Sequence, residues 1–368
     1  MASTAFAARR RITRSSREFR LVLVCCLLFC LFLSWCSSSF YSRASIQHSE
    51  FDPPRRGVPD AVDMRVNKDQ SQEVIAPGPW HSLDAAEHMT SMPLRLVSFN
   101  IRYATRRPVL GEQPWSVRCP KLCTQLRFVT AGHQSPFVCL QEALYSQVND
   151  VQAHLGSSWA FVGRGRGEGE TDGEFSPVFY RTDIWNCIRS ETRWLSPTPE
   201  KPSRGWDANL NRIVTMGEFS HRATNTRVVV MSTHFDNIGV VARNNSAKLL
   251  TEFAKEWGRG KGTESSAVLI GADFNSTPDE EAYKAMTAPG SGMSDIADLV
   301  PESRKYGNHL TYTSFGEPTE SPSRIDYLFI REPRTAKIET FGVLANSFDD
   351  QIRLSDHRAV VADLDIKV

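Results

Sequence analysis

Polar side chains follow five of the apolar runs in this sequence, at the points where each run would end as a β-strand. The five segments are Ser98-Phe99-Asn100, Leu140-Gln141-Glu142, Ser232-Thr233-His234-Phe235-Asp236, Gly271-Ala272-Asp273-Phe274-Asn275 and Leu354-Ser355-Asp356-His357-Arg358. A sixth run carries an acid, Asp326, inside the strand itself. Each segment alone is most simply a turn, a helix start or a buried histidine with satisfied partners. Together they supply the carboxylates, amides and histidines that attack of water on a phosphodiester needs.

The part of the chain that must position these residues alternates short apolar runs with helical patterns. The apolar runs predict strands over Arg95–Ile101, Pro136–Leu140, Ala160–Gly163, Pro177–Tyr180, Arg212–Phe219, Arg227–Thr233, Ala267–Gly271, Ile325–Ile330 and Ala359–Ile366. Helices are predicted over Ser116–Ala131, Gln147–Leu155, Gly239–Trp257 and Pro278–Met286. A capping box should open the last helix, with Thr277 as N-cap and Glu280 at the third helical position. Many strands with interspersed helices predict two sheets packed face to face and covered by helices.

The order of the motifs FN, QE, THFD, G-x-DFN, IDY and SDHR resembles the endonuclease/exonuclease/phosphatase superfamily. The resemblance covers Leu94–Val368, about three quarters of the chain. It is strongest to secreted or membrane-bound microbial members that share the segments Gly173–Arg181 (GEFSPVFYR) and Trp194–Asp207 (WLSPTPEKPSRGWD). It implies an α/β (α+β) fold, a four-layer sandwich of two packed, mainly antiparallel sheets flanked by helices.

The same resemblance implies a site for Mg²⁺ or Mn²⁺. Glu142 resembles the principal metal ligand, supported by Asn100, and Asp356 is the candidate second carboxylate ligand. A hard cation that keeps several waters needs only one or two carboxylates. Arg212 is a candidate contact to the substrate phosphate. Arg102 stands where repair nucleases often have another acid, so a second metal there is not expected.

The catalytic roles carry over in the same way. Asp273 resembles the acid that orients or deprotonates the attacking water, and Asn275 resembles a donor to a non-bridging phosphate oxygen. His357 would contact the phosphate or act as general base, with its ring held by Asp326. His234 sits where family members stabilise the pentacovalent state or protonate the leaving oxygen.

The amino-terminal 40 residues have the pattern of a membrane-targeting segment. An uncharged run, Leu21–Trp35, follows six arginines, and its extension to Phe40 gives the roughly 20 residues that a spanning helix needs. A cleaved secretory signal with its site near Cys36 is the alternative. We expect a basic cytosolic tail over 1–20, a signal anchor over 21–40, a linker over 41–93 and a catalytic domain over 94–368. Either reading puts the catalytic domain in the secretory lumen or outside the cell.

The charge balance bears on the substrate. Residues 1–93 hold 11 of the 43 Lys and Arg and 9 of the 42 Asp and Glu, which leaves 32 against 33 for residues 94–368. This near-neutral body lacks the positive field of a tight, non-specific nucleic-acid binder. A nuclease is still the first expectation, because nuclease activity is the commonest in the superfamily that the chain resembles. A phospholipid or sphingolipid phosphodiesterase and a small-molecule phosphatase are the alternatives. A binding protein without activity is not expected, because the set of polar residues is complete.

Four of the eight cysteines lie in the apolar amino-terminal segment and four in the body. Cys119 and Cys123 have the i, i+4 spacing of one helix face, with no histidine close by in the sequence. A zinc site is therefore not expected at this pair. The glycine-rich segment 163–173 is similar in composition to a phosphate-binding loop, but no P-loop lysine follows it. It is expected to be a mobile loop.

Overall fold

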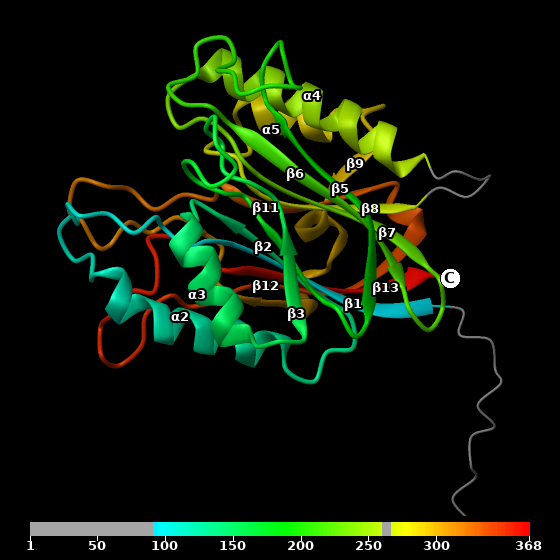
Figure 1. Ribbon diagram of the computed structural model, residues 1–368, viewed down its shortest axis with the longest axis horizontal. Coiled ribbons are helices and arrows are strands. Elements are labelled where there is room, and N and C mark those ends of the chain that lie inside the picture. The colour runs from blue at the N-terminus through cyan, green and yellow to red at the C-terminus, as the bar shows by residue number, and fades with distance from the viewer. Residues whose placement is uncertain (1–90, 260–265) are drawn as a thin grey trace, which may run out of the picture. The chain divides into compact units, whose positions relative to one another are not determined.

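Two β-sheets lie face to face, and helices cover both outer faces of the pair (Figure 1). The computed structural model describes residues 91–259 and 266–368. The expected cytosolic tail and anchor, and the expected linker up to residue 90, lie outside the described residues. Within the two described ranges, no helix combines the length and the apolar character needed to cross a membrane.

The first sheet has seven strands in the order β10-β12-β13-β1-β2-β4-β3. Its strands are β1 (Ser91–Asn100), β2 (Pro136–Gln141), β3 (Trp159–Val162), β4 (Val178–Arg181), β10 (Lys305–Gly307), β12 (Ala336–Val343) and β13 (Val360–Lys367). Neighbours β1 and β2 are parallel, with Asn100 level with Gln141. Because parallel strands end at the same edge of a sheet, the segments that follow β1 and β2 begin next to each other.

The second sheet has six strands in the order β5-β6-β7-β8-β11-β9. Its strands are β5 (Trp185–Trp194), β6 (Ile213–His221), β7 (Arg227–His234), β8 (Ala267–Asp273), β9 (Met293–Asp295) and β11 (Asp326–Arg331). Parallel pairing of β7 with β8 sets His234 opposite Asp273. Antiparallel pairing of β8 with β11 sets Asp326 opposite Asp273 on the other side. The register therefore puts three of the predicted site residues in one row across the sheet.

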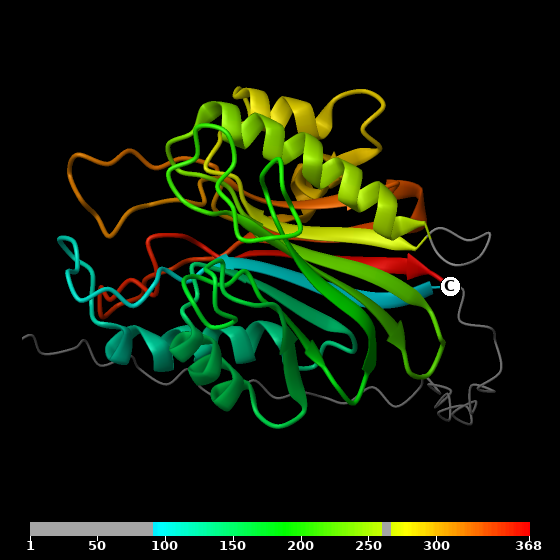
Figure 2. The same cartoon turned by 45° about the horizontal axis from the view of Figure 1, so that its top comes forward.

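Four α-helices in the described ranges complete the outer layers (Figure 2). Helices α2 (Trp115–Thr130) and α3 (Tyr145–Leu155) pack on the first sheet, and α4 (Val240–Gly258) and α5 (Glu281–Thr287) pack on the second. Three short 3₁₀ helices are η1 (Ile296–Leu299), η2 (Glu302–Arg304) and η3 (Pro333–Thr335).

Alternation along the central strands builds three apolar layers. In β1, Leu94 and Leu96 point into the core between the sheets, whereas Val97 and Phe99 join the core under α2 and α3. A third core lies between the second sheet and its two helices. Burying both faces of the central strands in this way fixes their register, because a slip by one residue would exchange the two faces.

The four-layer sandwich expected from the resemblance is confirmed, and most strand pairs in both sheets are antiparallel. The predicted start of the last helix was wrong. Helix α5 begins at Glu281, with Glu280 as its N-cap. Residues 277–280 form a separate turn, in which the Glu280 carboxylate accepts the Thr277 N–H at 2.7 Å. The capping pair thus closes the turn rather than the helix.

Candidate active site

The ends of β1, β2, β7 and β8 surround an open cleft with a volume of about 820 Å³. Seven of the nine residues that the sequence selected line this cleft: Glu142, Arg212, His234, Asp273, Asn275, Asp356 and His357. The other two, Asn100 and Asp326, are buried directly behind them, since each makes a hydrogen bond to a residue of the lining. The structure therefore brings the complete set together from seven separate segments.

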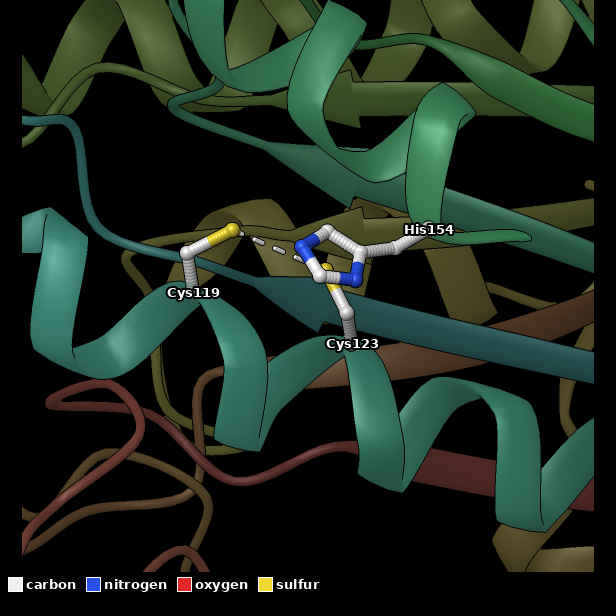
Figure 3. A group of neighbouring side chains, drawn as sticks. All are labelled: Cys119, Cys123 and His154. Atoms are coloured by element: carbon white, nitrogen blue, oxygen red, sulfur yellow. Dashed lines mark hydrogen bonds between the residues drawn. The ribbon is translucent and has the colours of Figure 1, made fainter. Parts of the chain in front are cut away.

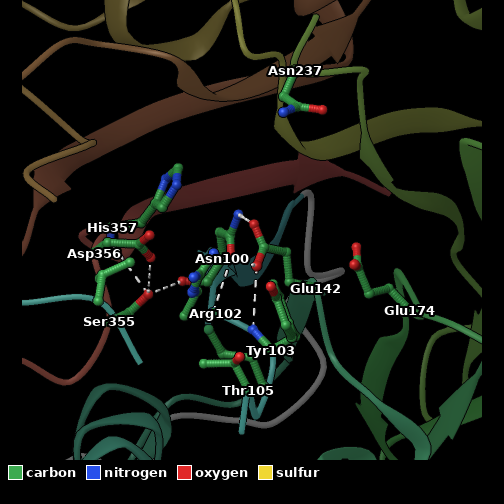
Figure 4. Close-up of polar contacts among 12 residues, drawn as sticks. Asn100, Arg102, Tyr103, Thr105, Glu142, Glu174, Asn237, Ser355, Asp356 and His357 are labelled. Carbon is green, nitrogen blue, oxygen red and sulfur yellow. Dashed lines mark hydrogen bonds and ion pairs between the residues drawn. The ribbon is translucent and has the colours of Figure 1, made fainter. Parts of the chain in front are cut away.

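Asn100 links the first predicted metal ligand to the predicted catalytic acid. Its Nδ2 donates to Glu142 Oε1 at 3.0 Å and to Asp273 Oδ2 at 2.8 Å. The Tyr103 N–H donates to the second Glu142 oxygen at 3.2 Å, and the Arg102 guanidinium lies 3.9 Å from it (Figure 4). Burial favours protonation of Glu142, but Arg102 and Asn100 outweigh it and lower the pKa of this carboxyl. Glu142 is thus held as a carboxylate.

Three residues of the cleft turn sharply out of their strand ends. Arg102, Glu142 and Asn275 have φ angles of +55°, +61° and +47°. Side chains other than glycine rarely adopt this left-handed region, and strain of this kind is concentrated at functional sites. The turn directs each side chain into the cleft instead of along the strand.

Asp273 lies at the centre of the site. Its Oδ1 accepts the Asn275 N–H at 2.9 Å, and its Oδ2 lies 3.4 Å from His234 Nε2 and 3.7 Å from His357 Nε2. Complete burial and the neighbouring Asp326 raise the pKa of Asp273 to about 7. A carboxyl with a pKa near neutrality is suited to taking up a proton from water.

His357 is held on its other side by Asp326. His357 Nδ1 lies 2.8 Å from Asp326 Oδ2, so this nitrogen carries the proton and donates it to the carboxylate. Burial alone would lower the pKa of His357, but Asp326 and Asp273 outweigh burial and raise it well above its ordinary value. The same three side chains offer donor atoms within 4.8 Å of one another.

His234 has the opposite electrostatic setting. Burial lowers its pKa well below the ordinary histidine value, and Arg212 and Arg166 lower it further. Its Nε2 lies 2.9 Å from Asn275 Nδ2, and that amide also donates to the Phe235 carbonyl at 3.0 Å. The imidazole is thus neutral and fixed in place.

Asp356 stands beside His357 with only 8% of its surface exposed. It accepts a hydrogen bond from the Ser355 hydroxyl at 3.1 Å. Burial raises the pKa of Asp356, His357 lowers it, and the Glu142 charge raises it, with a net upward shift. Burial is thus the main reason that protonation of Asp356 is favoured.

The donor chemistry of the cleft fits a hard divalent cation. Glu142 and Asp356 present carboxylate oxygens and act on each other electrostatically. Burial raises the pKa values of Asp356 and Asp273, and a cation bound beside them would favour their ionised forms. Mg²⁺ prefers oxygen ligands of this kind.

Arg212 reaches the cleft from the start of β6. Its Nε lies 3.3 Å from Asp236 Oδ2, and its Nη2 donates to Asn237 Oδ1 at 3.1 Å. Asp236 also accepts backbone N–H groups of four residues, namely Asn209, Leu210, Ile238 and Gly239. These donors outweigh burial and lower the pKa of Asp236 to about 2. Asp236 therefore fixes Arg212 and two loops at once.

Two functional candidates were missed by the sequence reasoning, Arg166 and Glu174. Both line the cleft, and Arg166 Nη2 donates to Glu174 Oε1 at 2.8 Å. Hydrogen bonds close the loop that carries Arg166, and its carbonyl accepts the Trp194 indole N–H at 2.9 Å. Glu174 lies in the GEFSPVFYR segment, and Arg166 lies between the glycines of the 163–173 loop. A charged residue inside a shared segment was the signal that could have found them.

Residues 97–357 match the model of the Endonuclease/Exonuclease/phosphatase family. A member of that family from Bacteroides vulgatus is 30% identical, with a TM-score of 0.66, and the alignment covers 75% of this chain and all of the other. A family protein from Bacteroides thetaiotaomicron is 28% identical over 76% of this chain and 99% of its own, with a TM-score of 0.66. A mannosyl-6-phosphatase of the same organism is 30% identical over 74% of this chain and 99% of its own, with a TM-score of 0.65. Comparison with curated proteins gave no significant match.

Proposed function

From the premise that this chain belongs to the endonuclease/exonuclease/phosphatase family of phosphoester hydrolases, we propose that it cleaves its substrate with a water molecule activated beside a divalent cation. The observation that carries this proposal is the position of Asp273. Its carboxylate lies between two imidazoles, with nitrogen atoms at 3.4 and 3.7 Å, and its pKa is about 7.

Asp273 and His357 have different roles in proton transfer. Asp273 takes the proton from the attacking water, because its pKa matches neutral pH. His357 is protonated, because Asp326 holds its Nδ1–H and raises its pKa. Its Nε2–H points toward Asp273 and is available to a phosphoryl oxygen in the same space. His234 is neutral, which makes it a hydrogen-bonding group more suited to the transition state than to proton delivery.

Glu142 and Asp356 would hold the cation, and Asn100 orients Glu142 by its hydrogen bond. A bound Mg²⁺ or Mn²⁺ would supply positive charge to the phosphoryl oxygens, where negative charge grows during the reaction. Arg212 binds a further phosphate oxygen, since Asp236 and Asn237 hold its guanidinium at the cleft wall.

The substrate that the cleft fits best is a phosphomonoester of a small molecule, such as a sugar phosphate. Arg166 and Arg212 both face the cleft, and a phosphomonoester dianion carries one more charge than a diester for them to bind. The near-neutral body and the 30% identity to a mannosyl-6-phosphatase support the same choice. The nuclease activity expected from the sequence is the second candidate, supported by two tyrosines in the lining, Tyr103 and Tyr312, on which a base could stack.

A substrate panel tests the proposal. The purified full-length protein is incubated with mannose 6-phosphate and other sugar phosphates, DNA and RNA oligonucleotides, and sphingomyelin, each with Mg²⁺ and with EDTA. We expect Mg²⁺-dependent release of phosphate from a sugar phosphate, and an Asp273→Asn variant should release none. Faster cleavage of an oligonucleotide would establish the nuclease instead. Full activity in EDTA would overturn the cation-dependent mechanism.

A further inference from the structure

Two cysteines and a histidine meet on the helical layer outside the first sheet. Cys119 and Cys123 lie one turn apart on α2, and His154 lies on the last turn of α3. Figure 3 shows the imidazole of His154 next to both sulfur atoms. Their potential ligand atoms all lie within 4.8 Å of one another. No histidine lies close to this cysteine pair in the sequence, but the fold brings His154 beside it from 31 residues away.

The distance between the sulfur atoms decides which chemistry the group fits. They lie 3.9 Å apart. A tetrahedral zinc ion with Zn–S bonds of about 2.3 Å requires a separation of roughly 3.8 Å. A disulfide requires about 2.05 Å, so the sulfurs would have to approach by nearly 2 Å. The observed spacing is already that of two ligands on one zinc ion.

A fourth polar group lies on the same side of α3. Asp150 is one turn before His154, so the two side chains share a helix face. Its carboxylate accepts the Trp115 indole N–H at 2.7 Å, a contact between α3 and the first residue of α2. The contact with Trp115 holds the Asp150 carboxylate on the side of α3 that faces α2.

The access to the group is also suitable. Cys119 and Cys123 are buried, whereas Asp150 and His154 are exposed. An ion can enter from the solvent side, and two thiolates with one imidazole match the softer ligands that zinc accepts and Mg²⁺ does not. The group shares no residue with the lining of the catalytic cleft.

We propose that Cys119, Cys123 and His154 bind a structural zinc ion that ties α2 to α3, with the fourth position on the exposed side beside Asp150. Each helix contributes ligands from one face, so the ion joins the two helices without altering either. The site is independent of the proposed catalytic cation and of the identity of the substrate.

Zinc content and thiolate ligation test the proposal. The full-length protein is purified under reducing conditions, stripped with chelator and titrated with Zn²⁺ in excess Mg²⁺, which occupies the catalytic site. We expect one zinc per chain, a higher melting temperature with zinc, and, when Co²⁺ replaces zinc, the absorption of thiolate-bound tetrahedral cobalt. His154→Ala should weaken zinc binding by about 100-fold. Loss of a residue that only supports a metal ligand already weakens binding by about 10–100-fold, and His154 is itself a ligand.

Two controls make the outcome decisive. His154 is exposed, so its replacement should leave the metal-free melting temperature unchanged and separate metal binding from folding. Cys187→Ser, on β5, should retain full zinc binding and the cobalt spectrum. Absence of zinc binding by the reduced, folded protein, a Cys119–Cys123 disulfide after purification, or unchanged zinc affinity in His154→Ala would each overturn the proposal.

Discussion

At the scale of residues, the hydrogen-bonded pair His357–Asp326 acts as one unit. Loss of a positioned acid–base group typically lowers the rate by about 10²–10⁴-fold. We expect His357→Ala to lower kcat by this order, because Asp326 alone cannot reach the substrate from its buried position. Asp326→Asn should lower kcat less, and the double variant should be no worse than His357→Ala. Steady-state kinetics of the three variants measure this, and additive losses would mean that the residues act separately.

The raised pKa of Asp273 predicts opposite pH dependences for activity and stability. As a base, the carboxyl must be ionised, so kcat should rise with pH through about 7. In the unfolded chain an Asp ionises near 3.9. Protonated Asp273 therefore contributes stability that is fully present below about pH 4 and is lost as pH rises through the folded pKa of about 7.

Asp273→Asn removes this titration. In EDTA at pH 8, the variant should have a higher free energy of unfolding than the wild type while having no activity. Urea unfolding at pH 4 and pH 8 measures the difference. A variant that is less stable than the wild type at pH 8 would show that the neighbours of Asp273 stabilise its ionised form, and it would contradict the raised pKa.

At this scale the sequence predicted nine site residues from their types and order, and the structure places all nine in or directly behind one cleft. Their roles remain predictions. Arg166 and Glu174 were missed, because a charged residue in a shared segment indicates a candidate but not its position, which depends on how the 163–173 loop folds back. That path is set by hydrogen bonds such as Trp194 to the Arg166 carbonyl, between residues 28 positions apart.

At the scale of elements, helix α2 supports the loops that carry the site. Arg118 is fully buried and donates to the carbonyls of Ile101, Arg102 and Leu354. Burial lowers the pKa of Arg118 despite the nearby Glu112. The guanidinium thus joins the segment after β1 to the segment that leads into Asp356.

Arg118→Met should therefore lower both stability and activity. The substitution leaves several buried carbonyls without a donor, and each such loss costs about 1–3 kcal/mol. We expect the free energy of unfolding to fall by about 3 kcal/mol or more, measured by urea titration. Arg127→Met, on the exposed side of the same helix, is the control and should change it by less than about 0.5 kcal/mol. Equal effects of the two substitutions would contradict the bridging role.

The elements that the sequence missed share a physical cause. β5 is an edge strand with mostly exposed side chains, so it lacks the apolar alternation by which strands are recognised. β12 is only partly buried over its first half. The central strands were predicted correctly, because both of their faces are buried and their sequences are almost continuously apolar.

At the scale of the whole molecule, we propose that the catalytic domain lies in the secretory lumen or outside the cell, on the ground of the six arginines before the apolar run Leu21–Trp35. Protease treatment of intact microsomes tests this placement. The domain should survive without detergent and be digested with it. Digestion in intact microsomes would show the opposite orientation.

The position of β1 has a consequence for how the protein is made. β1 pairs with β2 on one side and with β13 on the other, and the β1–β13 ladder joins Ser91 to Lys367. The polypeptide emerges during synthesis at about 5–20 residues per second. A gap must therefore stand open beside β1 for many seconds, until Val360–Lys367 arrives to fill it. The nascent chain cannot complete its central sheet before Val360–Lys367 has been synthesised, and it cannot join Asp356 and His357 to Asp273 before those two residues have been made.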